Sequence, residues 1–281
     1  MAVRQAAQIF DTHMKEVEKE SVPFSLSIID DFSNYEKVQS SLYVAPVSAE
    51  RSETLSDVPK QNIEGLNFVV KLQVMANEKT SASALIHDTH VKSWGIDADR
   101  LFADAWSNTE KIRPGKLYTM NEILSDMIGE DMDMLGTLEG DNPLMYVYTN
   151  NCKTDGAAGF FCDGVMDKIA ERLSGENYYM FPSSIHEVII VPERAFRPDQ
   201  VDDMYEMIAA GNGQIANESE ILSDTPYHYD VTEHKFEKAV DYAKRMEVSE
   251  SMEIFDDTAE SMEVDSIEMS VLNPEKAGIR M

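Results

Sequence analysis

Residues 67–86 read NFVVKLQVMANEKTSASALI. Between residues 68 and 74 every second position is apolar, which is the pattern of a strand with one buried face. A second strand-like run, residues 81–86, follows after the four polar residues 77–80. Two strands joined by so short a polar link predict a β-hairpin, and a hairpin makes an antiparallel pair.

The strand-like segments of the whole chain come in adjacent pairs. Strands that neighbour one another in sequence, instead of alternating singly with helices, indicate an α+β fold. We therefore expect mainly antiparallel sheet with flanking helices. Outside the hairpin, the predicted strands are residues 24–29, 42–47, 144–149, 157–161, 178–181 and 186–191.

Apolar residues at helical spacing predict the flanking helices, the first of them at the N-terminus. Gly95 closes one helix, because glycine is the usual residue just past a helix end, and Asp97 caps the next. Asp163 and Pro198 open two more, and the polar stretch 51–64 is expected to be a short helix or a loop. The predicted helices are residues 1–20, 87–94, 98–106, 120–128, 163–173, 198–211 and 233–247.

We expect residues 1–245 to form one α+β domain and residues 246–281 to form an acidic tail. Two halves are visible in the pattern, residues 22–115 and 143–230, and the sequence leaves open whether they share one sheet or one core. The tail carries one-sign charge and little bulk hydrophobicity, which favours disorder. Its scattered apolar residues leave open that it orders on a partner.

The composition excludes several classes of partner. The 281 residues include 52 acidic and 24 basic side chains, a formal net charge of −28. Direct binding to nucleic acid or to an anionic membrane requires clustered Lys and Arg, so we expect neither. No apolar stretch reaches the ~18 residues of a membrane span, and the N-terminus lacks the apolar run of a signal peptide. Two cysteines, Cys152 and Cys162, are too few for a disulfide framework, so we expect a cytoplasmic protein.

The run PSSIHE, residues 182–187, contains the strongest candidate site. His186 and Glu187 begin a buried strand, where neighbouring side chains point to opposite faces, so the two cannot hold one ion. We expect them to be bonded to the 145–151 segment as a structural pair or, alternatively, to serve ligand binding or catalysis. The candidate cluster is Asn150, Ser183, Ser184, His186 and Glu187.

Metal-binding patterns fail on their spacing. Asp131 and Asp133 start like a calcium-binding loop, but its fifth and twelfth positions, which supply oxygen ligands, are Leu135 and Asn142. A zinc-protease helix needs a second histidine four residues after His186, where Ile190 stands. We therefore expect no bound metal and no cofactor.

A series of short motifs runs through the chain in a recognisable order. PSSIHE is the most specific of them, and the others include MYVYTN (145–150), GAA (156–158) and YHYD (227–230). From about residue 35 to residue 230 the chain resembles an uncharacterised family of gut clostridial Firmicutes, known only as a domain of unknown function. The resemblance implies a bacterial cytoplasmic protein and no activity. The chain departs from it at Asp155, where an aromatic residue is expected before GAA.

Three functions follow from these observations. The first is a non-enzymatic binding or accessory protein whose acidic surface attracts a basic partner protein. The alternative is a hydrolase that uses His186 with Glu187, Cys152 or Ser183. The second alternative is an acidic mimic of nucleic acid that acts on a host defence enzyme, which requires acids spaced along one elongated face. The oligomeric state stays open.

Overall fold

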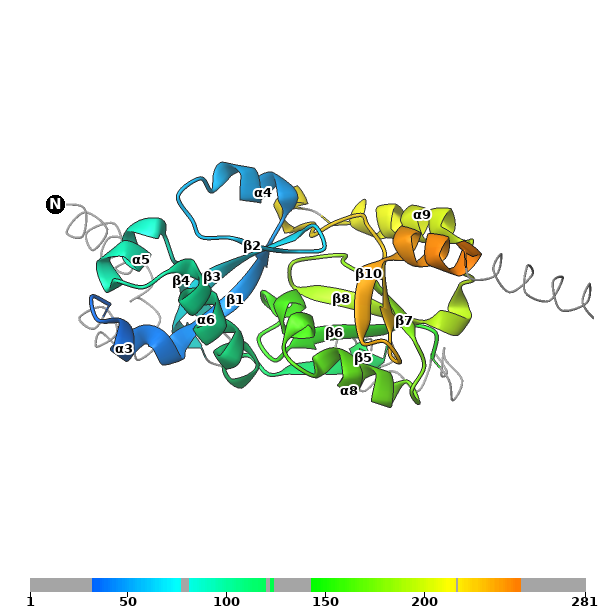
Figure 1. Ribbon diagram of the computed structural model, residues 1–281, viewed down its shortest axis with the longest axis horizontal. Helices are drawn as coiled ribbons and strands as arrows, with labels where there is room; N and C mark the ends of the chain where they lie inside the picture. The colour runs from blue at the N-terminus through cyan, green and yellow to red at the C-terminus, as the bar shows by residue number, and fades with distance from the viewer. Residues whose placement is uncertain (1–31, 77–80, 120–121, 124–142, 216, 249–281) are drawn as a thin grey trace, which may run out of the picture.

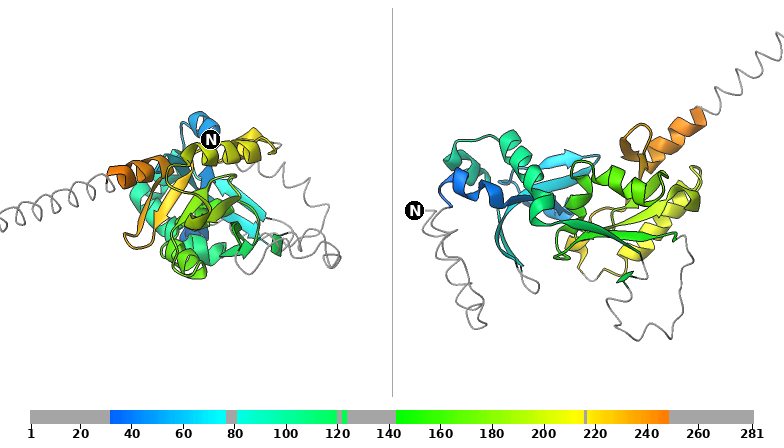
Figure 2. Two further views of the ribbon diagram at one scale, coloured as in Figure 1. Left: turned by 90° about the vertical axis from the view of Figure 1, so that its right-hand side faces the viewer. Right: turned by 90° about the horizontal axis from the view of Figure 1, so that it is seen from below.

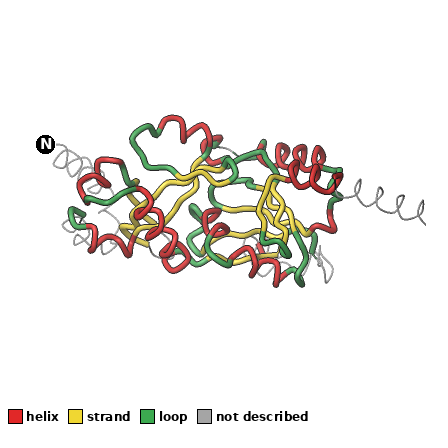
Figure 3. The backbone as a smooth tube through the Cα atoms, in the orientation of Figure 1, coloured by secondary structure: helices red, strands yellow, loops and turns green. Residues whose placement is uncertain are grey.

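The computed structural model describes residues 32–76, 81–119, 122–123, 143–215 and 217–248. The predicted N-terminal helix, the predicted strand 24–29, the acidic loop with Asp131, the predicted helix 120–128 apart from residues 122–123, and residues 249–281 of the acidic tail lie outside the described residues. Within them the fold is α+β, with two antiparallel sheets of four and six strands, as the paired strands predicted. The two sheets follow one another along the long axis of the molecule (Figures 1 and 3).

The first sheet is centred on β3 (Leu66–Ala76). β1 (Leu42–Val47) pairs with one edge of β3, and β2 (Gln61–Ile63) and β4 (Ser81–Leu85) both pair with the other. The β3–β4 pair is the predicted hairpin. Phe68, Val70 and Leu72 share one buried face of β3, since side chains alternate along a strand.

Helices cover the first sheet. α6 (Ala98–Ile112) packs Leu101, Phe102 and Ala105 into the core, and Asp97 caps it by accepting a hydrogen bond from the backbone of Arg100. α5 (Asp88–Trp94) ends at Gly95, whose φ of 68° is the left-handed conformation that favours glycine. The remaining short elements are α3 (Tyr35–Val38), η1 (Gln39–Ser41) and α4 (Ala49–Thr54).

The second sheet has the order β10-β9-β7-β8-β6-β5, and every neighbouring pair is antiparallel. β8, which contains Glu187, lies in the interior of this sheet between β7 and β6. The strands are β5 (Gly115–Thr119), β6 (Tyr146–Asn150), β7 (Tyr178–Phe181), β8 (Glu187–Pro192), β9 (Tyr227–Asp230) and β10 (Lys235–Lys238).

Helices cover both faces of the second sheet. η3 (Gly156–Phe161) and α8 (Val165–Arg172) lie on one face, and α9 (Val201–Asn212) and a helix over residues 239–248 lie on the other (Figures 1 and 2). Alternation along β7 serves both layers, because Tyr178 and Met180 join the core of the first face while Tyr179 and Phe181 join that of the second. The short turns η4 (Glu193–Ala195) and η5 (Glu218–Glu220) flank α9.

η3 connects the cores of the two sheets. The Phe161 ring lies 5.0 Å from that of Phe68 in β3 and 5.4 Å from that of Phe236 in β10, both edge-on. Such aromatic pairs stabilise beyond the area they bury. One cluster of buried side chains therefore runs through both halves, although the halves do not share a sheet.

Some predictions about elements are wrong. Residues 157–161 form the 3-10 helix η3 instead of a strand, since a short apolar run that is buried on all sides has no periodicity to identify it. Residues 235–238 form β10 instead of part of a helix, because Phe236 stacks on Tyr227 of β9. α8 begins after Gly164, and the predicted cap Asp163 makes no side-chain hydrogen bond to it. α9 begins at Val201 instead of at Pro198.

Candidate functional site

A partly buried ion pair lies at the junction of the two sheets. Asp155 follows β6, and its carboxylate oxygens lie 2.9 Å and 2.8 Å from Nζ of Lys71 in β3. The Tyr43 hydroxyl of β1 donates to the same carboxylate at 3.0 Å. The Asp155 side chain is only 3% exposed. Burying an unpaired charge is costly, and these two partners offset that cost.

The loop that presents Asp155 is held by Asn150. The Asn150 Oδ1 accepts the backbone N–H of Cys152 at 2.9 Å, and its Nδ2 donates to the carbonyl of Thr154 at 2.8 Å. Arg113 donates to that carbonyl at 3.0 Å and lies over the Tyr43 ring, 4.1 Å from its centroid. Asp155 itself has a φ of 54°, a strained conformation that its contacts maintain.

His186 joins this junction through both its ring and its backbone. Its Nδ1 accepts the backbone N–H of Asp155 at 3.2 Å, which places the lone pair on Nδ1 and the proton on Nε2. Nε2 lies 3.7 Å from the Glu220 carboxylate. The His186 carbonyl accepts the Thr149 hydroxyl at 2.8 Å, and a Cβ on Gly156 would lie 2.3 Å from it. Only glycine fits at position 156.

The other predicted site residues divide into two groups. The Ser184 hydroxyl accepts the backbone N–H groups of His186 and Glu187 at 3.0 and 3.2 Å, so it shapes the start of β8. The side chains of Ser183 and Glu187 make no hydrogen bond with any described residue. The structure thus brings together Asn150, Ser184 and His186 and leaves Ser183 and Glu187 outside their network.

Four residues of the junction were not among the predicted site residues. Two of them carry a signal in hindsight, because Lys71 is the only charged residue of an apolar strand and Asp155 directly precedes the apolar run GAAGFF. The other two, Tyr43 and Arg113, have no local signal. Tyr43 and Asp155 are 112 residues apart in the chain, so only the fold brings them together.

An acidic cleft of about 670 Å³ lies between α4 and the β2–β3 turn on one side and the end of α9 with η5 on the other. Three carboxylates line it, Glu50, Glu218 and Asp224, and its lining contains no Lys, Arg or His. Asn212, 4% exposed, donates to Asp224 at 2.6 Å and to the Ser223 carbonyl at 3.3 Å. Its buried Oδ1 has no hydrogen-bond partner among the described residues.

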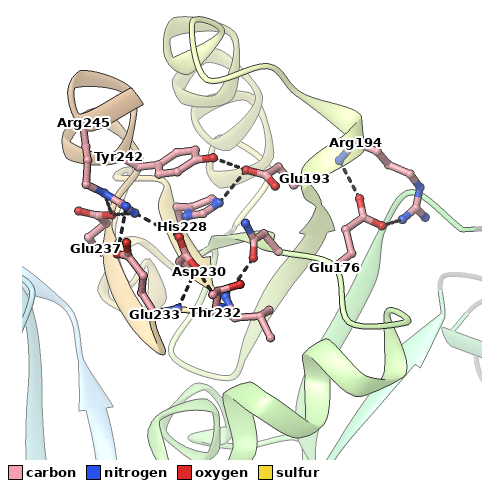
Figure 4. Close-up of polar contacts among 12 residues, drawn as sticks. Glu176, Glu193, Arg194, His228, Asp230, Thr232, Glu233, Glu237, Tyr242 and Arg245 are labelled. Carbon is pink, nitrogen blue, oxygen red and sulfur yellow. Dashed lines mark hydrogen bonds and ion pairs between the residues drawn. The ribbon is translucent and has the colours of Figure 1, made fainter. Parts of the chain in front are cut away.

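A second polar cluster is enclosed between the second sheet and its helices. In Figure 4 the side chains of His228 and Tyr242 both point toward Glu193. The His228 Nε2 lies 3.1 Å from Oε1 of Glu193, which also accepts the Tyr242 hydroxyl. Burial opposes ionisation of Glu193, but these hydrogen bonds outweigh it and lower the pKa of that carboxyl. His228 of β9 is fully buried, and its ring stacks on that of Tyr242 with centroids 3.5 Å apart. The cluster therefore joins the helix over residues 239–248 to the second sheet.

Ion pairs flank this cluster. Arg245 of the helix over residues 239–248 donates to Glu237 of β10 at 2.7 Å and to Asp230 of β9 at 3.4 Å (Figure 4). Arg194 pairs with Glu176 next to Glu193. Each of these charged side chains pairs with a residue of another segment, so the cluster and its ion pairs hold these segments together.

Within the described ranges, no three His, Cys, Asp or Glu side chains lie close enough together to hold a metal ion. None of the helices in the described part of the chain is both long and apolar enough to cross a membrane.

Residues 2–231 match the model of a family of unknown function, DUF5688, and the chain therefore belongs to that family. No curated protein and no solved structure matches the chain.

Proposed function

We propose that this member of the DUF5688 family is a non-enzymatic binding protein that holds a basic segment of a partner protein in its acidic cleft. The observation that carries the proposal is the lining of that cleft, with Glu50, Glu218 and Asp224 and without any basic side chain. A concave site of one charge sign concentrates the field and raises the local concentration of ligands of the other sign. The setting that we propose, following the sequence resemblance, is the cytoplasm of a bacterium.

The polar groups of the cleft suit Lys and Arg side chains. The carboxylates accept charge-assisted hydrogen bonds, which are shorter and stronger than neutral ones. The hydrogen bond from Asn212 holds the Asp224 carboxylate in place, so this side chain loses little conformational freedom when a ligand binds. The net charge of −28 would also accelerate the approach of a basic partner.

The described contacts favour this proposal over a hydrolase. A general base needs a free lone pair within hydrogen-bond reach of its nucleophile. The Nδ1 lone pair of His186 already accepts a backbone N–H, and the Cys152 thiol donates to Asn151 at 3.3 Å instead. Mimicry of nucleic acid requires acids along one extended face, whereas the cleft gathers three carboxylates in a concavity.

The test is fluorescence anisotropy of a labelled octalysine peptide titrated with the full chain. We expect saturable binding that weakens at about 0.5 M salt, because exposed charges are screened there. Glu50→Gln, Glu218→Gln and Asp224→Asn combined should weaken the binding about tenfold or more. The control combines Asp99→Asn, Asp163→Asn and Glu171→Gln at exposed positions away from the cleft, with the same change of charge. Equal weakening by both triple variants would reject the cleft as the site.

A further inference from the structure

A second pocket has the opposite charge to the cleft. It lies between β5 and α8, has a volume of about 310 Å³, and carries Lys116, Lys168 and Arg172 in its lining. We propose that this pocket binds a small organic anion, a carboxylate or phosphate attached to one compact apolar group. The proposal does not depend on the function assigned to the cleft, because the two sites share no residue.

Two of these cations lie together because they share one helix. Lys168 and Arg172 are four residues apart on α8, so they lie on the same face of the helix, one turn from each other. Lys116 lies at the edge of the pocket on β5, the last strand of the second sheet, and its ammonium group lies 4.4 Å from the centroid of the Tyr118 ring. In a protein with a net charge of −28, two basic side chains on one face of a helix beside a pocket form a local exception that attracts anions.

The protein itself neutralises these charges only in part. Lys168 and Arg172 form no ion pair with any described residue. Lys116 lies 3.5 Å from Glu122, an exposed pair of little strength in water. The guanidinium of Arg172 therefore remains available for the two-pronged hydrogen bonds by which arginine binds carboxylates and phosphates.

The wall and floor of the pocket define the rest of the ligand. Leu117, Val165 and Ile169 supply an apolar wall. At the floor, the buried hydroxyl of Tyr148 interacts with the Glu110 carboxyl. A Cβ on Gly115 would lie 1.9 Å from this hydroxyl, so the glycine makes room for it. The pocket thus offers an apolar surface beside a cationic rim.

Glu110 is the one carboxyl group in the lining. Its oxygens accept the backbone N–H of Gly115 at 3.3 and 3.4 Å, and burial raises its pKa. The raised pKa favours protonation of Glu110 when an anion enters the pocket. Protonation removes the negative charge that would otherwise repel the anion. A volume near 310 Å³ is at the small end of ligand pockets, so the ligand has the size of a single ring.

The experiment is isothermal titration of the full chain with three probes. Phenyl phosphate and phenylacetate represent the two kinds of anion, and benzyl alcohol is the neutral probe of similar shape. We expect at least one of the anions to bind and the alcohol not to bind. Binding of phenyl phosphate alone would assign a phosphate, binding of phenylacetate alone would assign a carboxylate, and either result supports the pocket.

Three variants separate this pocket from a general effect of charge. Lys168→Ala with Arg172→Ala should weaken anion binding about tenfold or more, because charge-assisted hydrogen bonds are lost. Lys92→Ala with Arg197→Ala removes the same charge from exposed positions elsewhere and should leave the affinity within about twofold. Glu110→Gln should tighten binding, since it removes a negative charge from the pocket. The proposal is overturned if neither anion binds at about 10 mM, or if both double variants weaken binding equally.

Discussion

The ammonium group of Lys71 lies within 2.9 Å of both carboxylate oxygens of Asp155, so a single ion pair joins β3 of the first sheet to the loop after β6 of the second. The carboxylate is almost fully buried, whereas the lysine side chain is 25% exposed. Removal of the partner therefore leaves the Asp155 carboxylate buried, whereas it leaves the Lys71 ammonium group in contact with water.

Lys71→Met is expected to destabilise the protein more than Asp155→Asn. The first leaves a buried carboxylate with only the Tyr43 hydroxyl as a neutral donor, at a cost of about 2–4 kcal/mol. The second leaves an ammonium group that reaches water, and asparagine tolerates the left-handed backbone at this position. Urea denaturation of both variants and of the double variant measures the coupling. Equal losses in the two single variants would contradict this account.

His186→Ala is expected to lower the melting temperature by several degrees. The variant leaves the buried backbone N–H of Asp155 without its acceptor, which costs about 1–3 kcal/mol, and each kcal/mol corresponds to roughly 2–4 °C in a chain of this size. Glu187→Ala, whose side chain makes no hydrogen bond with the described residues, is the control and should change the melting temperature less. An unchanged or higher melting temperature for His186→Ala would instead favour a ligand-binding role, because functional polar groups often burden the fold.

Gly156→Ala is expected to be strongly destabilising, by about 3 kcal/mol or more, because the added carbon meets backbone atoms that cannot move aside. It would lie 2.3 Å from the His186 carbonyl oxygen and 2.8 Å from the Asn150 nitrogen. Gly211→Ala is the matched control, since nothing lies within 4 Å of its added carbon inside α9. That control should stabilise by about 0.5–1 kcal/mol. Thermal denaturation of the pair measures both effects, and a Gly156→Ala variant as stable as the parent would refute the predicted packing.

The cluster around Glu193 predicts a loss of stability in acid. The pKa of this carboxyl is lowered in the folded protein, so its ionised form stabilises the fold above the unfolded value of about 4.3. This contribution disappears as the pH falls through the folded pKa. Glu193→Gln should therefore flatten the acid side of a plot of melting temperature against pH. Glu171→Gln, at an exposed position on α8, should leave that slope unchanged.

The elements that local pattern defines were predictable from the sequence. The β3–β4 hairpin, the stop of α5 at Gly95 and the cap of α6 by Asp97 each depend on residues a few positions apart. β10 was mistaken for helix because its stabilising contact, Phe236 against Tyr227, comes from the neighbouring strand β9. Residues 157–161 took a 3-10 form that their apolar run alone does not specify.

The same distinction applies to the polar junction. The sequence pointed to Asn150, Ser184 and His186, together with Ser183 and Glu187, because they lie in two short motifs that place polar residues next to buried strands. It could not assign Tyr43 or Arg113, since these side chains reach Asp155 and its loop only after two sheets have formed. Ionic and aromatic contacts between distant segments have no periodicity along the chain.

The position of Phe161 between the two sheets has a consequence during synthesis of the chain. Phe68 needs the ring of Phe161 to complete its packing, and that residue leaves the ribosome about 90 positions later, a delay of roughly 5–20 s at bacterial and eukaryotic rates of elongation. For that interval the apolar face of β3 is incomplete. The nascent first half is then a substrate for chaperones and proteases, and the speed of translation through residues 69–161 becomes one determinant of how much protein reaches the folded state.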